Sequence, residues 1–190
     1  MKLALILFRH GKIKSSNNIF CGWLNYPLDS QGIAQAKKLS ARLARETIDV
    51  AFCSDQLRSK QALVEVLARH PGAKVIVDHR LRERHYGTFS GQSKDSLKND
   101  NPAKFHEIHR AYHARIPDGE NMYHVSKRVF PFMNDLLRFM QRERVNVAIS
   151  AHTNSLRLIQ EYLEVLPKLE VTKLEHEPTS YKKYFLNFEG

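Results

Sequence analysis

Cysteine is scarce in this chain, which has only Cys21 and Cys53 among its 190 residues. Two cysteines provide neither a disulfide framework nor a cysteine-rich metal site, and such sparse use fits a reducing cytoplasm. The chain also lacks an apolar run long enough for a membrane span: Leu3 to Phe8 has only the length of a strand, and no signal-peptide cleavage pattern follows it. We therefore expect a cytoplasmic protein without a membrane partner.

Acidic side chains are outnumbered, because 20 Asp and Glu stand against 30 Lys and Arg and leave a formal net charge of +10 at pH 7. This excess predicts an anionic partner, and nucleic acid and phosphorylated metabolites both qualify. The Lys and Arg residues are scattered through predicted helices without a recognisable nucleic-acid motif, which favours a small phosphorylated metabolite. A basic anion-binding or nucleic-acid-binding module is the non-enzyme alternative.

Repeats and low-complexity tracts are absent, and 42% of the residues are apolar and 26% charged. This composition is typical of an ordinary globular protein and excludes a disordered chain. A chain of this length buries roughly 70% of the surface that its unfolded form exposes. We expect a single domain over residues 1–190, for which a homodimer is a possible assembly.

Strand and helix patterns alternate in the first part of the chain. Strands are expected at Leu3–Phe8, at "DVAFCS" (49–54) and at "AKVIVD" (73–78). Helices are expected between them, one from an N-cap at Ser30 to about residue 43 and one over 57–70. This alternation predicts an α/β fold with three α/β/α layers around a mostly parallel central sheet.

The rest of the chain begins with a charged, glycine-punctuated segment, 79–101, which we interpret as a loop that builds a site. Helices are expected next over 102–114 and about 120–141, and Pro131 should kink or break the second. A buried strand follows at "VNVAIS" (145–150), and then a loop that enters an amphipathic helix at "AHTNSLRLIQEYLEVL" (151–166). The stretch "SYKKYFLNF" (180–188) is expected to form an edge strand.

Two histidines stand directly after predicted strands: His10 follows the first strand and His152 follows "VNVAIS". The carboxyl ends of parallel strands meet at one edge of a sheet, where ligands bind in open α/β folds, so we expect the two imidazoles to lie together. Arg9 precedes His10, Arg58 is expected in the first turn of a helix after a neighbouring strand, and Glu83 lies in the loop after the third strand.

These residue types match the requirements of phosphoryl transfer, which are an in-line nucleophile, positive groups for the phosphoryl oxygens and a proton donor for the leaving oxygen. A neutral imidazole can accept a phosphoryl group, and guanidiniums bind phosphate oxygens bidentately. The sequence therefore predicts a phosphoryl-transfer site that needs no metal ion.

The segments "LFRHG", "FCGW", "LRSKQA", "ERHYGTFSGQSK", "PDGEN" and "AHTNSLR", in this order, resemble the histidine phosphatase superfamily, and most closely its cofactor-dependent phosphoglycerate mutases. The resemblance covers residue 5 to about residue 165 and implies a phosphoglycerate mutase-like fold. It implies that His10 becomes phosphohistidine, that Arg9, Arg58 and His152 hold the phosphoryl group, and that Glu83 acts as acid and base.

The resemblance also implies substrate contacts, because residues after the glutamate engage the substrate in the mutases. Candidate substrate-binding residues are Arg84, Tyr86, Lys94 and Asn154, together with Asn17, Cys21, Gly22 and Arg110. The chain departs from the mutases before "FCGW", where it is one residue shorter and lacks their Glu-Ser pair.

Two reactions stay open. Arg84, Tyr86 and Lys94 suit a substrate with a carboxylate and a phosphate, which favours interconversion of 3-phosphoglycerate and 2-phosphoglycerate with 2,3-bisphosphoglycerate as primer. However, the cap segment around 95–118 is short beside that of the mutases, and little chain follows the last helix. A less covered site admits water, which hydrolyses phosphohistidine, so a phosphatase of small phosphate monoesters is the alternative.

The segment "HEIHRAYH" allows a third interpretation, in which His106, His109 and His113 share one helical face at spacings that can bind a transition metal. The alternative is that these histidines face solvent on a mobile cap above an anion pocket. We expect the latter, and no metal site.

Overall fold

In the computed structural model, which describes residues 1–15 and 18–188, one mixed sheet has the strand order β3-β2-β4-β1-β5. The strands β3, β2, β4 and β1 run parallel to one another, and β5 is antiparallel to β1. The sheet is therefore mostly parallel, as predicted. The strands are β1 (Lys2–Arg9), β2 (Val50–Cys53), β3 (Lys74–Val77), β4 (Val147–Ala151) and β5 (Tyr181–Asn187).

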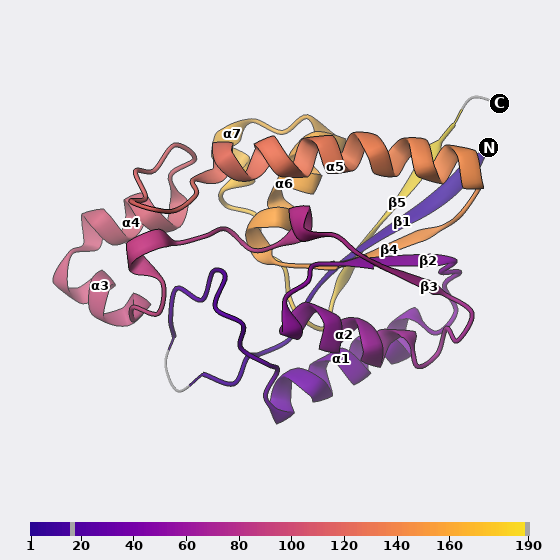
Figure 1. Ribbon diagram of the computed structural model, residues 1–190, viewed down its shortest axis with the longest axis horizontal. Helices are drawn as coiled ribbons and strands as arrows, with labels where there is room; N and C mark the ends of the chain where they lie inside the picture. The colour runs from indigo at the N-terminus through magenta and orange to yellow at the C-terminus, as the bar shows by residue number, and fades with distance from the viewer. Residues whose placement is uncertain (16–17, 189–190) are drawn as a thin grey trace.

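Helices cover both faces of this sheet (Figure 1), with α1 (Ser30–Leu43) and α2 (Leu57–Leu67) on one face and α5 (Met122–Glu143) and α6 (Thr153–Glu164) on the other. The alternation of side chains along β1 explains the division. Leu3, Leu5 and Leu7 join the apolar cluster of α5 and α6, whereas Ile6 and Phe8 join that of α1 and α2. The predicted α/β/α layers are confirmed.

A small lobe lies beyond one end of the sheet, at the left of Figure 1, and holds α3 (Lys94–Asp100) and α4 (Pro102–Arg110). Its own apolar cluster includes Phe20, Tyr86 and Ile108. This lobe contains the predicted cap segment, 95–118. The remaining short elements are two turns of 3₁₀ helix, His79–Leu81 and Gly87–Phe89, and the helix α7 (Lys168–Val171).

Some element boundaries differ from the prediction. Asp29, and not Ser30, caps α1, because its Oδ1 accepts the Gly32 N–H at 2.7 Å. The helix expected over 102–114 ends at Arg110, since Ala111 takes an extended conformation with ψ 132°. The short helices α3 and α7 were not predicted.

Pro131 does not break α5, which is continuous from Met122 to Glu143. The proline lies on the exposed side of the helix. The backbone hydrogen bond that proline removes is therefore lost where water can replace it, and the buried face of the helix stays intact.

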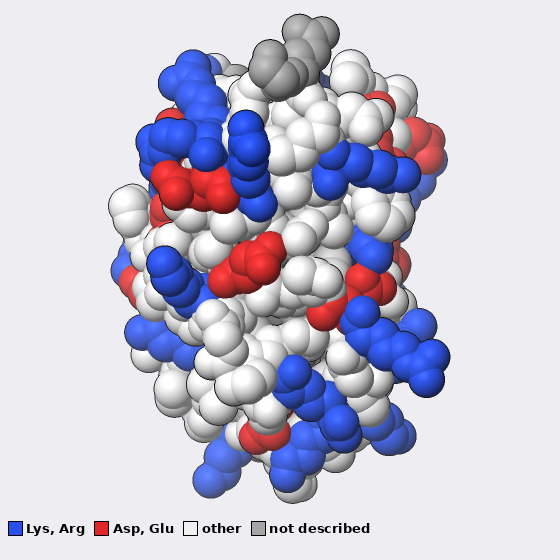
Figure 2. Space-filling model, turned by 90° about the vertical axis from the view of Figure 1, so that its right-hand side faces the viewer, with Lys and Arg blue, Asp and Glu red and all other residues white. Residues whose placement is uncertain are grey.

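The lysine and arginine side chains are spread over the surface. Figure 2 shows the right-hand side of Figure 1, where basic side chains alternate with acidic and uncharged ones and form no continuous stripe. None of the helices in the described part of the chain has both the length and the apolar character needed to cross a membrane.

The turn after β1 packs backbone to backbone against the start of α1. A Cβ on Gly32 would stand 2.1 Å from the Lys12 carbonyl oxygen, and one on Gly11 would stand 2.5 Å from the Gly32 carbonyl oxygen. Two glycines in contact thus allow α1 to approach the segment that carries His10.

We expect Gly32→Ala to destabilise the protein, although alanine usually favours a helix over glycine by about 1 kcal/mol. The clash is with backbone atoms that cannot rotate away, so the midpoint of urea unfolding should fall. Gly72→Ala is the matched control, because nothing lies within 4 Å of a Cβ there. An unchanged or raised midpoint for Gly32→Ala would contradict the close packing.

Candidate active site

His10 and His152 come together at the carboxyl edge of the sheet, as predicted. The parallel pairing of β1 with β4 places Arg9 opposite Ala151, and one residue later each strand delivers a histidine. The ring centroids are 4.9 Å apart in an edge-to-face arrangement, and both side chains are buried.

The hydrogen bonds of His10 leave Nε2 as the nucleophilic atom. Nδ1 donates to the Gly11 carbonyl at 2.8 Å, and Nε2 accepts from Arg58 Nε at 3.2 Å. Burial, together with the charges of Arg58 and Arg9, lowers the pKa of His10 well below its usual value. The imidazole is therefore neutral at neutral pH, with its lone pair directed at the guanidinium that would bind phosphoryl oxygens.

Arg58 is fixed by two carbonyl groups of the loop after β1. Its Nη1 donates to Leu24 O and its Nη2 to Gly22 O, each at 2.7 Å. Gly22 has a φ of +48°, and a Cβ there would lie 3.0 Å from the Arg84 carbonyl oxygen. The backbone conformation at position 22 thus requires glycine, and the Gly22 carbonyl orients the Arg58 side chain.

Ser54, directly after β2, orients the His152 ring. The Ser54 hydroxyl lies 2.7 Å from His152 Nε2, and its oxygen also accepts the Gln56 N–H at 3.3 Å. Burial and the neighbouring charges of Arg58 and His10 lower the pKa of His152 well below its usual value.

Two buried nitrogens at this edge have no hydrogen-bond partner within residues 1–15 and 18–188, namely His152 Nδ1 and Arg9 Nε. Arg9 otherwise donates from Nη1 to the His176 carbonyl at 3.3 Å. Arg9 Nε is a donor, and buried donors are normally paired, so its lack of a partner beside a nucleophile indicates a place for an anion.

Glu83 is held at the first turn of α6. Its Oε1 accepts backbone N–H groups from Arg84 at 2.8 Å and Asn154 at 3.2 Å, and its own N–H donates to Gln56 Oε1. Glu83 therefore faces the cavity as the only carboxylate in the set predicted to be catalytic, and it can exchange a proton with a leaving oxygen.

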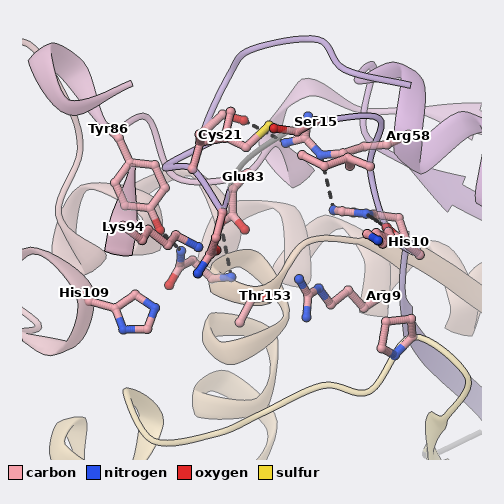
Figure 3. Close-up of a pocket in the computed structure, with 18 of the residues that line it drawn as sticks. Arg9, His10, Ser15, Cys21, Arg58, Glu83, Tyr86, Lys94, His109 and Thr153 are labelled. Atoms are coloured by element: carbon pink, nitrogen blue, oxygen red, sulfur yellow. Dashed lines mark hydrogen bonds between the residues drawn. The ribbon is translucent and has the colours of Figure 1, made fainter. Parts of the chain in front are cut away.

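Arg9, His10, Arg58 and Glu83 line one cavity of about 750 Å³, whereas His152 is fully buried beside His10 and does not line it. In Figure 3, His10, Arg9 and Arg58 lie on one side, and Tyr86, Lys94 and His109 lie on the other, with Glu83 between them. The first side offers the phosphoryl site, and the second side, formed by the lobe, is its distal end.

The structure brings most of the predicted substrate residues to this cavity. Tyr86, Lys94, Asn154, Cys21, Gly22 and Arg110 line it. The Cys21 thiol donates to Leu24 O at 3.4 Å, and burial raises its pKa, so it is a packing group of the wall. The predicted contact by Asn17 lies outside the described residues.

Arg84 does not line the cavity. Its side chain is 1% exposed, donates to the Ile108 carbonyl and lies with its guanidinium carbon 4.6 Å from the centroid of the Tyr86 ring. The expectation that Arg84 grips the substrate is not supported by this placement. Its position instead makes Arg84 a support behind Tyr86.

The histidine cluster divides. His113 lies beyond the end of α4, and His106 and His113 are exposed. His109 lines the cavity and stacks on Phe105, and burial, then Lys94 and Arg110, lowers its pKa to about 3. The expectation that all three face solvent is therefore wrong for His109. In the described segments, no group of His, Cys, Asp or Glu is arranged to hold a metal ion.

Sequence reasoning missed three charged residues of the cavity, Lys12, Arg157 and Glu175. Arg157 is one helical turn after Asn154 and donates to its side-chain oxygen at 3.1 Å, so helical spacing could have found it. Glu175 lies in the irregular segment between α7 and β5, where no pattern marks it. This segment also brings Pro178 to the wall of the cavity, which the sequence did not indicate.

The family model of the histidine phosphatase superfamily (branch 1) matches residues 5–188. The chain belongs to this superfamily. The resemblance inferred from the motifs is confirmed, and the chain is an enzyme of this superfamily.

Two relatives with the same name are similar in sequence over most of this chain. A 2,3-bisphosphoglycerate-dependent phosphoglycerate mutase of Azorhizobium caulinodans is 37% identical over 187 residues, covering 92% of this chain and 88% of the relative. One of Brucella melitensis is 32% identical over 181 residues, covering 92% and 88%.

Two solved phosphatase structures are similar in fold. A mycobacterial glucosyl-3-phosphoglycerate phosphatase complexed with VO3 has a TM-score of 0.83 at 26% identity, covering 95% of this chain and 92% of that one. A putative alpha-ribazole-5'-P phosphatase of Escherichia coli has a TM-score of 0.84 at 22% identity, covering 97% and 91%, and shows the fold alone.

Acid should destabilise this superfamily member through its buried histidines. Burial lowers the folded-state pKa of His10 and His152 well below 6.5, and that of His109 and His176 to about 3 and about 4. Below roughly pH 6.5 the unfolded chain binds protons at these histidines and the folded chain does not. The contribution of these histidines to the free energy of unfolding is therefore fully present above that pH and decreases below it.

We expect the urea midpoint to fall between pH 7 and pH 5, a range that lies above the titration of ordinary carboxylates. His109→Gln should reduce this fall, because it removes one of the buried imidazoles. Equal midpoints at both pH values would show that these histidines are not held neutral.

Proposed function

We propose that this enzyme moves a phosphoryl group through a phosphohistidine on His10, and that its reaction is the interconversion of 3-phosphoglycerate and 2-phosphoglycerate. The observation that carries the phosphoryl step is the neutral His10 Nε2, which accepts a hydrogen bond from Arg58 beside the unpaired Arg9 Nε–H and the ring of His152. The mutase assignment is supported by the relatives at 32% and 37% identity.

In the first step, His10 Nε2 forms a bond to phosphorus while the bond to the ester oxygen breaks. Arg58 Nε–H then loses its imidazole acceptor and binds a phosphoryl oxygen, as do Arg9 and His152. Glu83 passes a proton to the leaving oxygen, which departs as an alcohol. These cations neutralise the transferred group, so the step needs no metal ion.

The mutase reaction requires a second transfer, from phosphohistidine to the other hydroxyl of the glycerate. The substrate's carboxylate must therefore be held at the distal end while the two oxygens that carry phosphate in turn change places beside His10. Lys94, Tyr86 and Asn154 line that end and supply a cation and polar groups. A bisphosphate that donates one phosphoryl group to His10 would prime the enzyme, which is the expected role of 2,3-bisphosphoglycerate.

Hydrolysis of small phosphate monoesters is the second candidate. The placement of Arg84 favours it, because this arginine is buried behind Tyr86 and cannot grip a carboxylate. A mutase with one fewer distal cation holds its intermediate less firmly, and water then reaches the phosphohistidine more often.

A small phosphorylated metabolite, and not nucleic acid, is the proposed partner in both cases. The cavity of about 750 Å³ has the size of a site for a small ester. The lysine and arginine residues also form no recognisable nucleic-acid motif.

Incubation with labelled 2,3-bisphosphoglycerate, in buffer containing a chelator, should trap a phosphoenzyme that is labile in acid and stable in base, because phosphoimidazole has those properties. His10→Ala should abolish the label and the turnover. His106→Ala is the matched control, since His106 is exposed on α4. Label on a hydroxyl group, or a need for a divalent ion, would contradict this chemistry.

Lys94→Ala should shift the products from 2-phosphoglycerate toward free phosphate, because the distal grip keeps the bisphosphate intermediate bound. A charge-assisted hydrogen bond is worth roughly 1.5–3 kcal/mol, so mutase efficiency should fall by about 10–100-fold. Lys98→Ala, one turn further along α3, is the control because Lys98 is exposed and outside the cavity.

Both products are measured in parallel from 3-phosphoglycerate. If the unsubstituted enzyme forms no 2-phosphoglycerate even when primed with bisphosphate, yet hydrolyses several phosphate esters, the mutase assignment is wrong and the enzyme is a phosphatase.

A further inference from the structure

Glu175 reaches the distal end of the cavity from the segment between α7 and β5. Its Oε1 lies 2.8 Å from a terminal nitrogen of Arg110, on the lobe, and 3.3 Å from Nη2 of Arg157, on α6. All three residues line the cavity that contains His10. One carboxylate oxygen thus joins three separate parts of the chain across the distal end.

The two arginines differ in their need for this carboxylate. Arg157 is 3% exposed, and burial lowers its pKa, so its charge has little help from water. Its other nitrogens donate to Leu174 O at 2.8 Å and Asn154 Oδ1 at 3.1 Å, and Glu175 is the anion beside its Nη2. Without Glu175, a buried cation would face the cavity unpaired.

Glu175 itself is weakly anchored. Its side chain is 56% exposed, and the segment that carries it has no regular structure between α7 and β5. Although burial by itself raises its pKa, the hydrogen bond from Arg110 and the charge of Arg157 lower the pKa of Glu175 below its usual range. Glu175 is therefore an ionised carboxylate that can leave at low cost, while the arginines stay in place.

We propose that Glu175 is a specificity-determining residue that occupies the subsite for the distal carboxylate of the substrate. A phosphorylated carboxylic acid displaces Glu175 from Arg110 and Arg157, and these arginines then bind the substrate's carboxylate in its place. This inference rests on the proposed function, because it names the residues that receive the far end of phosphoglycerate.

Displacement makes Glu175 a competitor for one class of substrate only. An ester with a distal carboxylate must break the contacts of Glu175, whereas an ester with a neutral far end can bind beside them. Glu175 therefore weakens the binding of acidic esters and leaves that of neutral esters unchanged. The pair 3-phosphoglycerate and glycerol 3-phosphate tests this, since the two differ in having a carboxylate or a hydroxymethyl group.

The experiment measures the dissociation constants of both esters by calorimetry in a His10→Ala background, where no chemistry interferes. Adding Glu175→Gln should tighten 3-phosphoglycerate by roughly 10-fold, the size expected for a hydrogen bond to a charged group. Glycerol 3-phosphate should change by less than about 2-fold.

Glu177→Gln is the matched control for charge alone. Glu177 is exposed in the same segment, two residues away, and lies outside the cavity. It should leave both constants unchanged. Arg110→Gln provides a second variant that does not depend on how Glu175→Gln folds, and it should weaken 3-phosphoglycerate and spare glycerol 3-phosphate.

Equal tightening of both esters by Glu175→Gln would show a general charge effect and overturn the proposal. Weaker binding of 3-phosphoglycerate would overturn it too, because Glu175 would then hold the substrate itself. If the two esters bind but neither variant changes their ratio, the subsite is elsewhere and only this inference fails. If neither ester binds with Glu175 present or replaced, the proposed function fails and this inference falls with it.

Discussion

The parallel pairing of β1 with β4 is the constraint on which the site depends. It sets Arg9 opposite Ala151, so that the next residue of each strand, His10 and His152, enters the same small volume. A shift of one residue in this register would turn one imidazole toward the opposite face of the sheet. The register is fixed by burial, because both strands are covered by helices on both faces and their apolar side chains have no exposed alternative.

Burial of these histidines makes it costly for them to carry a charge, and the neighbouring arginines increase that cost. Neutral imidazoles surrounded by Arg9 and Arg58 avoid adding charge to a buried cationic cluster, and their lowered pKa values express this. The cluster nevertheless retains the Arg9 Nε–H donor without an acceptor. A phosphoryl group that accepts this hydrogen bond gains binding energy from it. The expected acid sensitivity and the proposed binding of a phosphoryl group thus follow from the same cluster.

The sequence predicted the sheet, its flanking helices and the edge where the histidines meet, since long apolar periodicities and strand ends depend on local pattern. It also placed Arg58 and Glu83 beside them. It failed where tertiary contacts decide. Arg84 follows Glu83 in the chain, yet its side chain turns to the Ile108 carbonyl and packs behind Tyr86. Glu175 reaches the cavity from a segment with no periodicity, so only the packed structure reveals it.

These two unforeseen placements bear on the same question, the balance between transfer and hydrolysis. The phosphoryl end of the cavity is common to both reactions, because either one begins with a phosphohistidine. The difference lies in how long an intermediate stays bound at the distal end. Burial of Arg84 removes one cation from that end, and Glu175 occupies two more, Arg110 and Arg157. On our proposals, the distal grip is conditional on the exchange of one carboxylate for another, and the balance between transfer and hydrolysis depends on a segment far in sequence from His10.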